Sequence, residues 1–144
     1  MSLAKGWGVG VSGALWAVVY NLIWGAAWFA FMRREWRDAM AAIGRPIPFT
    51  QETWLLWVAL TIPIGLVIMT YATGRAGSPT KAAVTAAVAL WVLMTLGLAA
   101  WASRESLSLR IIALDSAVNL FSTIAASLAG GWSQRQQGAS AFLP

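Results

Sequence analysis

The sequence predicts an all-α, polytopic membrane protein in which four transmembrane helices form an antiparallel bundle. Of its 144 residues, 59% are hydrophobic and only 10% are charged, whereas soluble domains average about 25% charged residues. A chain this short cannot bury so much apolar material in a core of its own. Most of that material lies in four long apolar segments separated by short polar connections. These observations exclude a soluble globular enzyme and a disordered chain.

Each of the four segments is long enough to cross a bilayer, which takes about 20 residues of helix. Each segment should be helical, because backbone polar groups cannot stay unpaired in lipid. The expected spans are residues 8–31, 54–73, 82–102 and 107–131, and they make residues 1–144 a single domain. The first span is longer than the apolar region of a signal peptide, and no small-residue cleavage site follows it. We therefore expect it to be a retained helix.

The longest connection follows the first span. Its apolar residues Trp36, Met40 and Ile43 recur at spacings of four and three, with charged residues between them. This pattern predicts a short amphipathic helix over residues 33–43 that lies at the membrane interface. Gly44 can end this helix, because glycine readily adopts the left-handed conformation of a helix C-terminus. The other two connections are short and rich in turn-forming residues.

The sequence lacks the residues that most catalytic and metal sites need. It has no cysteine and no histidine, which excludes disulfides, thiolate or imidazole metal sites and the commonest general base. No serine has a base beside it, no paired carboxylates lie within a span, and no phosphate-binding glycine loop is present. We therefore expect a protein that is not an enzyme and that holds no metal or other cofactor.

The net charge of +5 comes from basic residues that are scattered singly or that flank the apolar segments. This distribution indicates contact with lipid headgroups, and no nucleic-acid partner is expected. Six Lys and Arg residues fall on the side of the first and third connections, and four fall on the side of the two termini. The positive-inside rule then favours termini on the non-cytoplasmic side. The excess of Arg over Lys and the many alanines suggest a GC-rich bacterium, and hence its inner membrane.

The most informative single residue is Asp115, which lies about two and a half turns into the fourth span. An acid inside a membrane helix costs on the order of 2.5–3.5 kcal/mol to insert, and such residues usually have a function. Asn119 and Ser122 follow at spacings of four and three, so the three side chains share one helix face. Arg110 lies near the helix entry, where we expect it to reach the headgroups rather than Asp115.

Tyr20 and Asn21 lie near the middle of the first span and match this polar stripe in depth. We predict an interhelical hydrogen-bond network that joins the first and fourth spans and contains Asp115, Asn119, Asn21, Tyr20 and Ser122. Three interpretations of Asp115 are open at this point: a structural link between helices, a proton- or cation-coupled site, and a contact to a partner subunit or bound cofactor. The structural link is the simplest of the three.

The ten tryptophans divide by depth, and seven of them lie at or near span ends, where they form an aromatic belt. These seven are Trp7, Trp28, Trp36, Trp54, Trp57, Trp101 and Trp132. In the first span, Trp16, Tyr20, Trp24 and Trp28 recur every four residues and form an aromatic ridge. The ridge either packs in the bundle or faces lipid. Alternatively, it contacts a partner or a flat apolar ligand such as a carotenoid, quinone or chlorin.

Small residues recur four apart in the first, third and fourth spans, which permits close helix approach within the bundle or across a subunit interface. The pairs and triplet are Gly6 and Gly10, Gly13 and Ala17, Ala82 and Ala86, Ala83 and Ala87, and Ser122, Ala126 and Gly130. Pro63 should kink the second span. A kink that serves packing is the simpler interpretation, and a broken helix that serves as a binding site is the alternative.

Several runs resemble one family. They are Gly13-Ala14-Leu15-Trp16, a connection with Trp36, Met40 and Gly44, the Leu90-Trp91 pair, and Ile112-Ala113-Leu114-Asp115-Ser116-Ala117-Val118-Asn119. Together they look like the small four-helix bacterial membrane proteins classed as a domain of unknown function, DUF1761-like. The resemblance implies a four-helix membrane fold, carries no assigned activity and transfers no site residues.

Two functional hypotheses follow from the residues. The first is a non-enzymatic accessory or structural subunit of a larger membrane complex. The spans contain few polar side chains that could carry out chemistry, and they contain many small-residue and aromatic faces suited to helix packing. Its partners would be membrane lipids and either other proteins of a complex or further copies of the chain. The second is a small transporter or a protein that binds a lipophilic ligand (a lipid, quinone or carotenoid) through an intramembrane Asp115 site.

Overall fold

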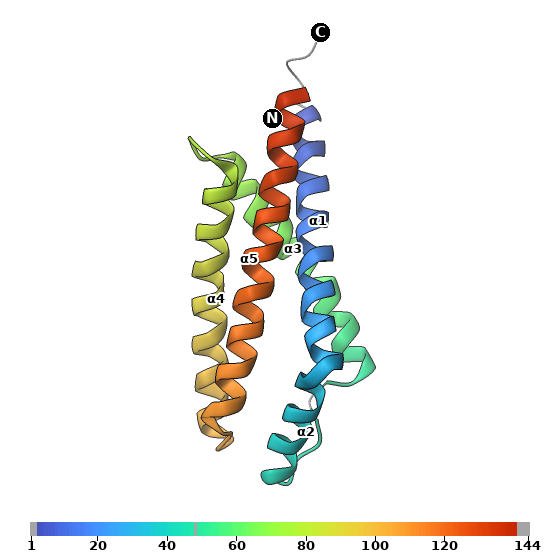
Figure 1. Cartoon of the computed structure of the whole chain (residues 1–144), viewed down its shortest axis with the longest axis vertical. Coiled ribbons are helices and arrows are strands. Elements are labelled where there is room, and N and C mark those ends of the chain that lie inside the picture. The colour runs from blue at the N-terminus through green and yellow to red at the C-terminus, as the bar shows by residue number, and fades with distance from the viewer. Residues whose placement is uncertain (1–2, 48, 141–144) are drawn as a thin grey trace.

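The computed structural model describes residues 3–47 and 49–140, and within them it contains helices and no strand. The first helix, α1 (Leu3–Ala27), continues through a π-helical turn, η1 (Trp28–Met32), into α2 (Arg33–Ala42). Three further helices follow, namely α3 (Gln51–Thr73), α4 (Pro79–Arg104) and α5 (Leu109–Ser140). Because α1, η1 and α2 form one continuous rod, the molecule is a bundle of four long helices (Figure 1). The predicted all-α, four-helix fold is confirmed.

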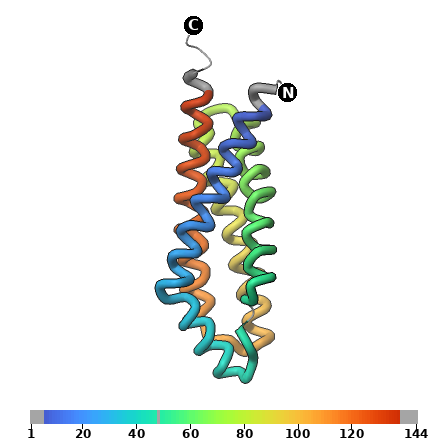
Figure 2. The backbone as a smooth tube through the Cα atoms, turned by 90° about the vertical axis from the view of Figure 1, so that its right-hand side faces the viewer, coloured from blue at the N-terminus to red at the C-terminus, as the bar shows by residue number. Residues whose placement is uncertain are grey.

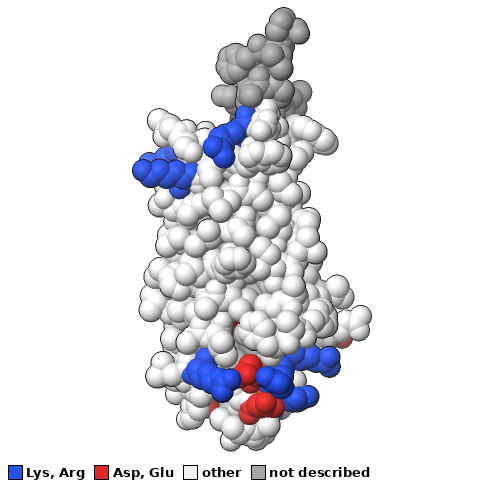
Figure 3. All heavy atoms as spheres, viewed as in Figure 1, with Lys and Arg blue, Asp and Glu red and all other residues white. Residues whose placement is uncertain are grey.

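All four rods are long and apolar enough to cross a membrane. The qualifying segments are Gly6–Ala42, Gln51–Thr73, Pro79–Arg104 and Leu109–Gln137. They contain the four expected spans almost entirely and extend beyond them, most of all in the first segment, which runs past residue 31 to Ala42. On the face that Figure 3 shows, charged side chains gather at the two ends of the molecule and leave a wide uncharged zone between them. This distribution is what a bilayer requires of a protein that crosses it.

The start of α1 and the end of α5 lie at the same end of the bundle (Figures 1 and 2). We call the half that contains them the terminal half, and the opposite half the α2 half. α5 packs along both α1 and α4, and α1 also packs along α3. The contact between α3 and α4 is less extensive.

Short side-chain caps begin two of the helices. Thr50 Oγ1 accepts a hydrogen bond from the backbone N–H of Thr53 at 3.3 Å and so caps α3. Ser78 caps α4 in the same way, and Pro79 occupies the first turn, where its missing N–H costs nothing. α2 ends before Gly44, whose φ of +69° is left-handed as the sequence predicts.

Small residues bring the helices close together in the terminal half. A Cβ atom on Gly65 of α3 would lie only 2.5 Å from the carbonyl oxygen of Gly13 on α1. A Cβ atom on Gly131 of α5 would lie 2.6 Å from Cα of Thr80 on α4. Both crossings therefore depend on glycine. The expected close approach of small residues is confirmed at Gly13, whereas Gly10 has open space around it.

Two details concern helix shape. α3 stays helical without interruption across Pro63, so the alternative of a broken helix at this proline is not borne out. α2 continues the first helix, and its apolar residues Trp36 and Met40 are buried in the protein core; the interfacial position of this segment stays a prediction. Two ion pairs tie this region to later helices: Glu35 of α2 pairs with Arg110 of α5 at 3.0 Å, and Arg45, which follows α2, pairs with Glu105 at the end of α4 at 2.9 Å.

Candidate functional site

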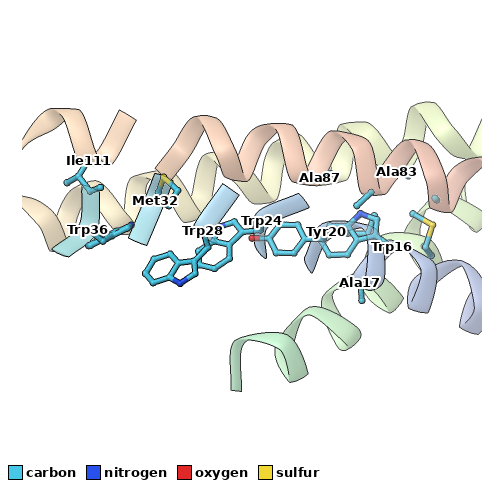
Figure 4. Close-up of a cluster of buried hydrophobic side chains, with 14 of the residues drawn as sticks. Trp16, Ala17, Tyr20, Trp24, Trp28, Met32, Trp36, Ala83, Ala87 and Ile111 are labelled. Carbon is cyan, nitrogen blue, oxygen red and sulfur yellow. The ribbon is translucent and has the colours of Figure 1, made fainter. Parts of the chain in front are cut away.

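The aromatic ridge of α1 is buried in the bundle. Trp16, Tyr20, Trp24 and Trp28 are between 1% and 8% exposed, so the interpretation that the ridge faces lipid is wrong. Their rings stack in pairs along the helix, with centroids 5.3 Å apart for Trp16 and Tyr20 and 5.4 Å apart for Trp24 and Trp28. The side chains follow one line along the rod that α1 begins (Figure 4).

The buried line continues past the ridge at the same spacing of four, through Met32, Trp36 and Met40. On a regular α-helix, a spacing of four advances by about 40° at each step, so a long line would turn away from the core. The π-helical turn at Trp28–Met32 has more residues per turn and offsets part of this drift. It therefore lets Trp36 of α2 face α5.

A chain of hydrogen bonds links α2, α5 and α1. Trp36 Nε1 donates to Asp115 Oδ1 at 3.2 Å. Asp115 Oδ2 accepts from Asn119 Nδ2 at 2.8 Å. Asn119 Oδ1 in turn accepts from the Tyr20 hydroxyl at 2.5 Å. The structure thus brings together three of the five predicted network residues, and α1 and α5 are joined around Asp115 as expected.

Asn21 and Ser122 lie outside this network. Asn21 follows Tyr20 directly and so points about 100° further around α1. There it donates to Thr61 Oγ1 of α3 at 2.7 Å. Ser122 donates to the carbonyl oxygen of Val118, one turn earlier in its own helix, at 2.8 Å. Asn21 was placed in the Asp115 network because the prediction matched its depth and ignored the direction of its side chain. Ser122 was placed there because it shares a helix face with Asn119, but its hydroxyl bonds to its own helix instead.

The tryptophans supply further links that the sequence analysis missed. Trp16 Nε1 donates to Ser127 Oγ of α5 at 2.9 Å. Trp91 Nε1 of α4 donates to the carbonyl oxygen of Ser116 at 2.8 Å. Indole N–H groups usually find an acceptor when buried. That rule, together with the many serines and threonines of the fourth span, is the signal that predicts such pairs.

A cavity of about 280 Å³ lies beside Asp115 in the α2 half. All four rods and the segment before α3 contribute to its wall. The lining residues are Trp24, Trp36, Phe49, Trp57, Met94, Thr95, Leu98, Trp101, Asp115, Ser116 and Asn119. Its most polar side chains come from one face of α5, and aromatic rings supply most of the rest. We call this space the Asp115 cavity.

The aromatic rings around the cavity stand in several planes. Trp36 meets Phe49 edge-on, at 5.6 Å between centroids and 76° between planes. Trp36 and Trp101 are tilted by 32° at 6.1 Å. Trp24 and Phe49 are tilted by 55° at 5.9 Å. The rings therefore line the cavity in several planes instead of forming a single flat stack.

Three buried polar atoms of the lining residues have no hydrogen-bond partner, namely Trp24 Nε1, Trp57 Nε1 and Ser116 Oγ. Asp115 itself is 8% exposed and forms no ion pair among the described residues. Arg110, the nearest base in sequence, pairs with Glu35 instead. This agrees with the expectation that Arg110 does not pair with Asp115. Buried polar atoms without a hydrogen-bond partner, such as Trp24 Nε1 and Ser116 Oγ, are rare in proteins and usually require an explanation.

Sequence reasoning also missed four of the aromatic wall residues. It did not place Phe49 at all, and it assigned Trp36, Trp57 and Trp101 to the belt at the membrane surface. The available signal was the side of the membrane, because Asp115 lies in the first half of its span and so on the same side of the bilayer as Trp36, Trp57 and Trp101. Belt residues on that side can reach the acid when their side chains point inward.

Within the described residues, no group of three or more acidic side chains could hold a metal ion. No protein-family model, curated protein or solved structure matches the chain. The fold and the cavity therefore define its class on their own: a four-helix protein with helices suited to cross a membrane and an acid in an aromatic interior. The DUF1761-like resemblance stays a prediction.

Proposed function

We propose that this chain is a non-enzymatic membrane protein that binds a small lipophilic molecule in the Asp115 cavity. One observation carries the proposal. A bundle of only 144 residues keeps a cavity of about 280 Å³ whose wall combines aromatic rings with a buried carboxyl group. Binding sites for small molecules are concave, mostly apolar, and carry a few polar groups that fix orientation. The Asp115 cavity has each of these properties.

A purely structural role of Asp115 explains less of the geometry. The hydrogen bonds from Trp36 to Asp115 and from Tyr20 to Asn119 are enough to link the helices, and they need no cavity beside them. Protein interiors are otherwise close-packed, and a cavity costs stability. An unpaired buried polar group costs about 1–3 kcal/mol more. A bound molecule that fills the space and pairs Trp24 Nε1 and Ser116 Oγ would offset both costs.

The seam between α3 and α4 supports a ligand that arrives through the membrane. In the terminal half, this seam forms an apolar groove of about 580 Å³. Along α4, Leu93 is the last residue that lines the groove, and the next residue, Met94, is the first that lines the Asp115 cavity. A molecule dissolved in the hydrocarbon core would reach the cavity along this seam without crossing a charged surface.

We further propose that the protein lies in a bacterial inner membrane, with both termini on the non-cytoplasmic side. The described ends of α1 and α5 share one end of the bundle (Figure 1). Six of the ten Lys and Arg residues belong to the opposite end, which the positive-inside rule assigns to the cytoplasm.

The accessory-subunit hypothesis is the alternative. α4 is the least buried of the four membrane-crossing segments, with 11% of its most apolar window buried. Its exposed side chains, Val92, Leu93 and Leu96 among them, are suited to a protein partner as well as to lipid. This alternative predicts a stable complex with other subunits and an empty Asp115 cavity.

Native mass spectrometry on protein extracted gently from its own membranes tests the proposal. We expect a small molecule bound in a fixed ratio to the chain, retained by a Gly97→Phe variant and lost from a Thr95→Phe variant. Thr95 lines the cavity, so the phenyl ring would fill it, whereas Gly97 is exposed on the same helix with no side chain near it. The proposal would be contradicted if the native chain carried no small molecule, or if both variants retained the molecule equally.

A further inference from the structure

The wall of the Asp115 cavity indicates which chemical class of ligand it takes. We infer that the ligand is a lipophilic organic cation, with its charged nitrogen at Asp115 and its apolar part among the tryptophans. This inference rests on the proposed function and makes it more specific. It is carried by three features of the site: an acid without a cationic partner, aromatic rings that line the same cavity in several planes, and a polar wall on α5 opposite a mainly apolar wall on α4.

The first feature is the charge balance. Asp115 accepts hydrogen bonds from Trp36 Nε1 and Asn119 Nδ2, and both donors are neutral. The described Lys and Arg side chains that form ion pairs do so with acids at the α2 end, and none pairs with Asp115. Buried charges are normally paired, because an isolated ion in an apolar interior is expensive. A ligand cation would complete the pair.

The second feature is the set of aromatic rings. Trp24, Trp36, Trp57 and Trp101 line the same cavity as the carboxyl group, together with Phe49. The ring face of tryptophan attracts cations more strongly than that of tyrosine or phenylalanine, and the attraction grows when water is excluded. Because the rings are tilted by 32° to 76° against one another, they surround a compact group. A flat pigment would need parallel walls.

The third feature is the position of the polar groups. Asp115, Ser116 and Asn119 lie on one stretch of α5, whereas α4 contributes mainly apolar surface from Met94, Leu98 and Trp101, with Thr95 as its one polar lining residue. A ligand with a charge at one end and an apolar body at the other matches this arrangement. Ser116 Oγ and Trp24 Nε1 remain as hydrogen-bonding groups for a polar substituent of the ligand or for a water molecule that accompanies it.

A pair of isosteric probes tests the inference on the unmodified full-length protein. Benzyltrimethylammonium carries a positive charge, and neopentylbenzene has the same shape with carbon in place of nitrogen. Binding is followed by isothermal titration in detergent, supported by the tryptophan fluorescence of the cavity. We expect the cation to bind at least about tenfold more tightly than the neutral isostere, which corresponds to about 1.4 kcal/mol. Equal affinities, or tighter binding of neopentylbenzene, would overturn the inference and leave the proposed function in place.

Matched variants then locate the site. Asp115→Asn removes the charge and keeps the size, and its control is Asp38→Asn, an exposed acid on α2 outside the cavity. We expect Asp115→Asn to weaken benzyltrimethylammonium binding by about tenfold or more and to leave neopentylbenzene binding unchanged. Asp38→Asn should change neither. Loss of both probes in Asp115→Asn, with no small molecule found on the native protein, would overturn the proposed function as well.

The rings are tested in the same way. Trp101→Leu removes a cavity wall that makes no hydrogen bond to Asp115, and its control is Trp132→Leu, where the side chain is 55% exposed at the other end of the bundle. We expect several-fold weaker cation binding in Trp101→Leu alone. Equal binding by the two variants would show that the aromatic wall does not contact the cation.

Discussion

Trp36 Nε1 lies 3.2 Å from Asp115 Oδ1 and donates a hydrogen bond to it, which ties the rod that begins with α1 to α5. The two residues are 79 positions apart in the sequence and meet because η1 keeps the buried line of the rod facing the core. Asp115 is in turn held by Asn119, so its carboxyl group has one oxygen fixed by each neighbour. The acid is therefore held in a defined position beside the cavity.

Replacing Trp36 with phenylalanine tests this link. Trp36→Phe removes the indole N–H and keeps an aromatic ring, so Asp115 Oδ1 loses its donor in a buried site. We expect a loss of about 1–3 kcal/mol in stability, measured as a lower melting temperature in detergent. Trp132→Phe is the control, because that side chain is largely exposed. If the two variants melt at the same temperature, the hydrogen bond does not stabilise the bundle.

The Tyr20 hydroxyl offers a second, independent measure of the same network. Tyr20→Phe removes the donor to Asn119 Oδ1 and leaves the ring stacked on Trp16. Interhelical hydrogen bonds in membrane proteins are worth about 0.6 kcal/mol on average and up to roughly 2. We expect a stability loss in that range for Tyr20→Phe and none for Tyr71→Phe, whose side chain is exposed. A larger effect at Tyr71 would contradict the assignment of the network.

The sequence was sufficient to predict the fold and the centre of the site, but not its walls. Composition and segment length predict four helices because a bilayer leaves few other solutions. Asp115 and Asn119 were identified because polar residues in an apolar helix are conspicuous. Trp57 and Trp101 were assigned to the membrane surface, since the depth of a side chain follows from its place in a span but its direction depends on helix packing. The π turn that orients Trp36 has no marker in the sequence.

The glycine contact between α1 and α3 predicts a specific sensitivity to one methyl group. Gly65→Ala would place its Cβ 2.5 Å from the carbonyl oxygen of Gly13, so the two backbones must separate. Overpacking of this kind typically costs about 1–3 kcal/mol, and we expect the melting temperature to fall. Gly10→Ala is the control, because nothing lies within 4 Å of its added methyl group. Unchanged melting of Gly65→Ala would show that the helices do not cross there.

The proposed orientation can be measured directly, because the natural sequence contains no cysteine and each single-cysteine variant reports on one position. Ala76→Cys places a thiol in the exposed turn between α3 and α4, and Ala41→Cys places one on the exposed face of α2 at the opposite end. The α2 end carries six of the ten basic residues and should face the cytoplasm. A membrane-impermeant maleimide should therefore label Ala76→Cys in intact spheroplasts and label Ala41→Cys only after permeabilisation. The reverse pattern would place the termini in the cytoplasm. The Asp115 cavity, which lies in the α2 half, would then be nearer the outer surface, and an organic cation would reach it from outside.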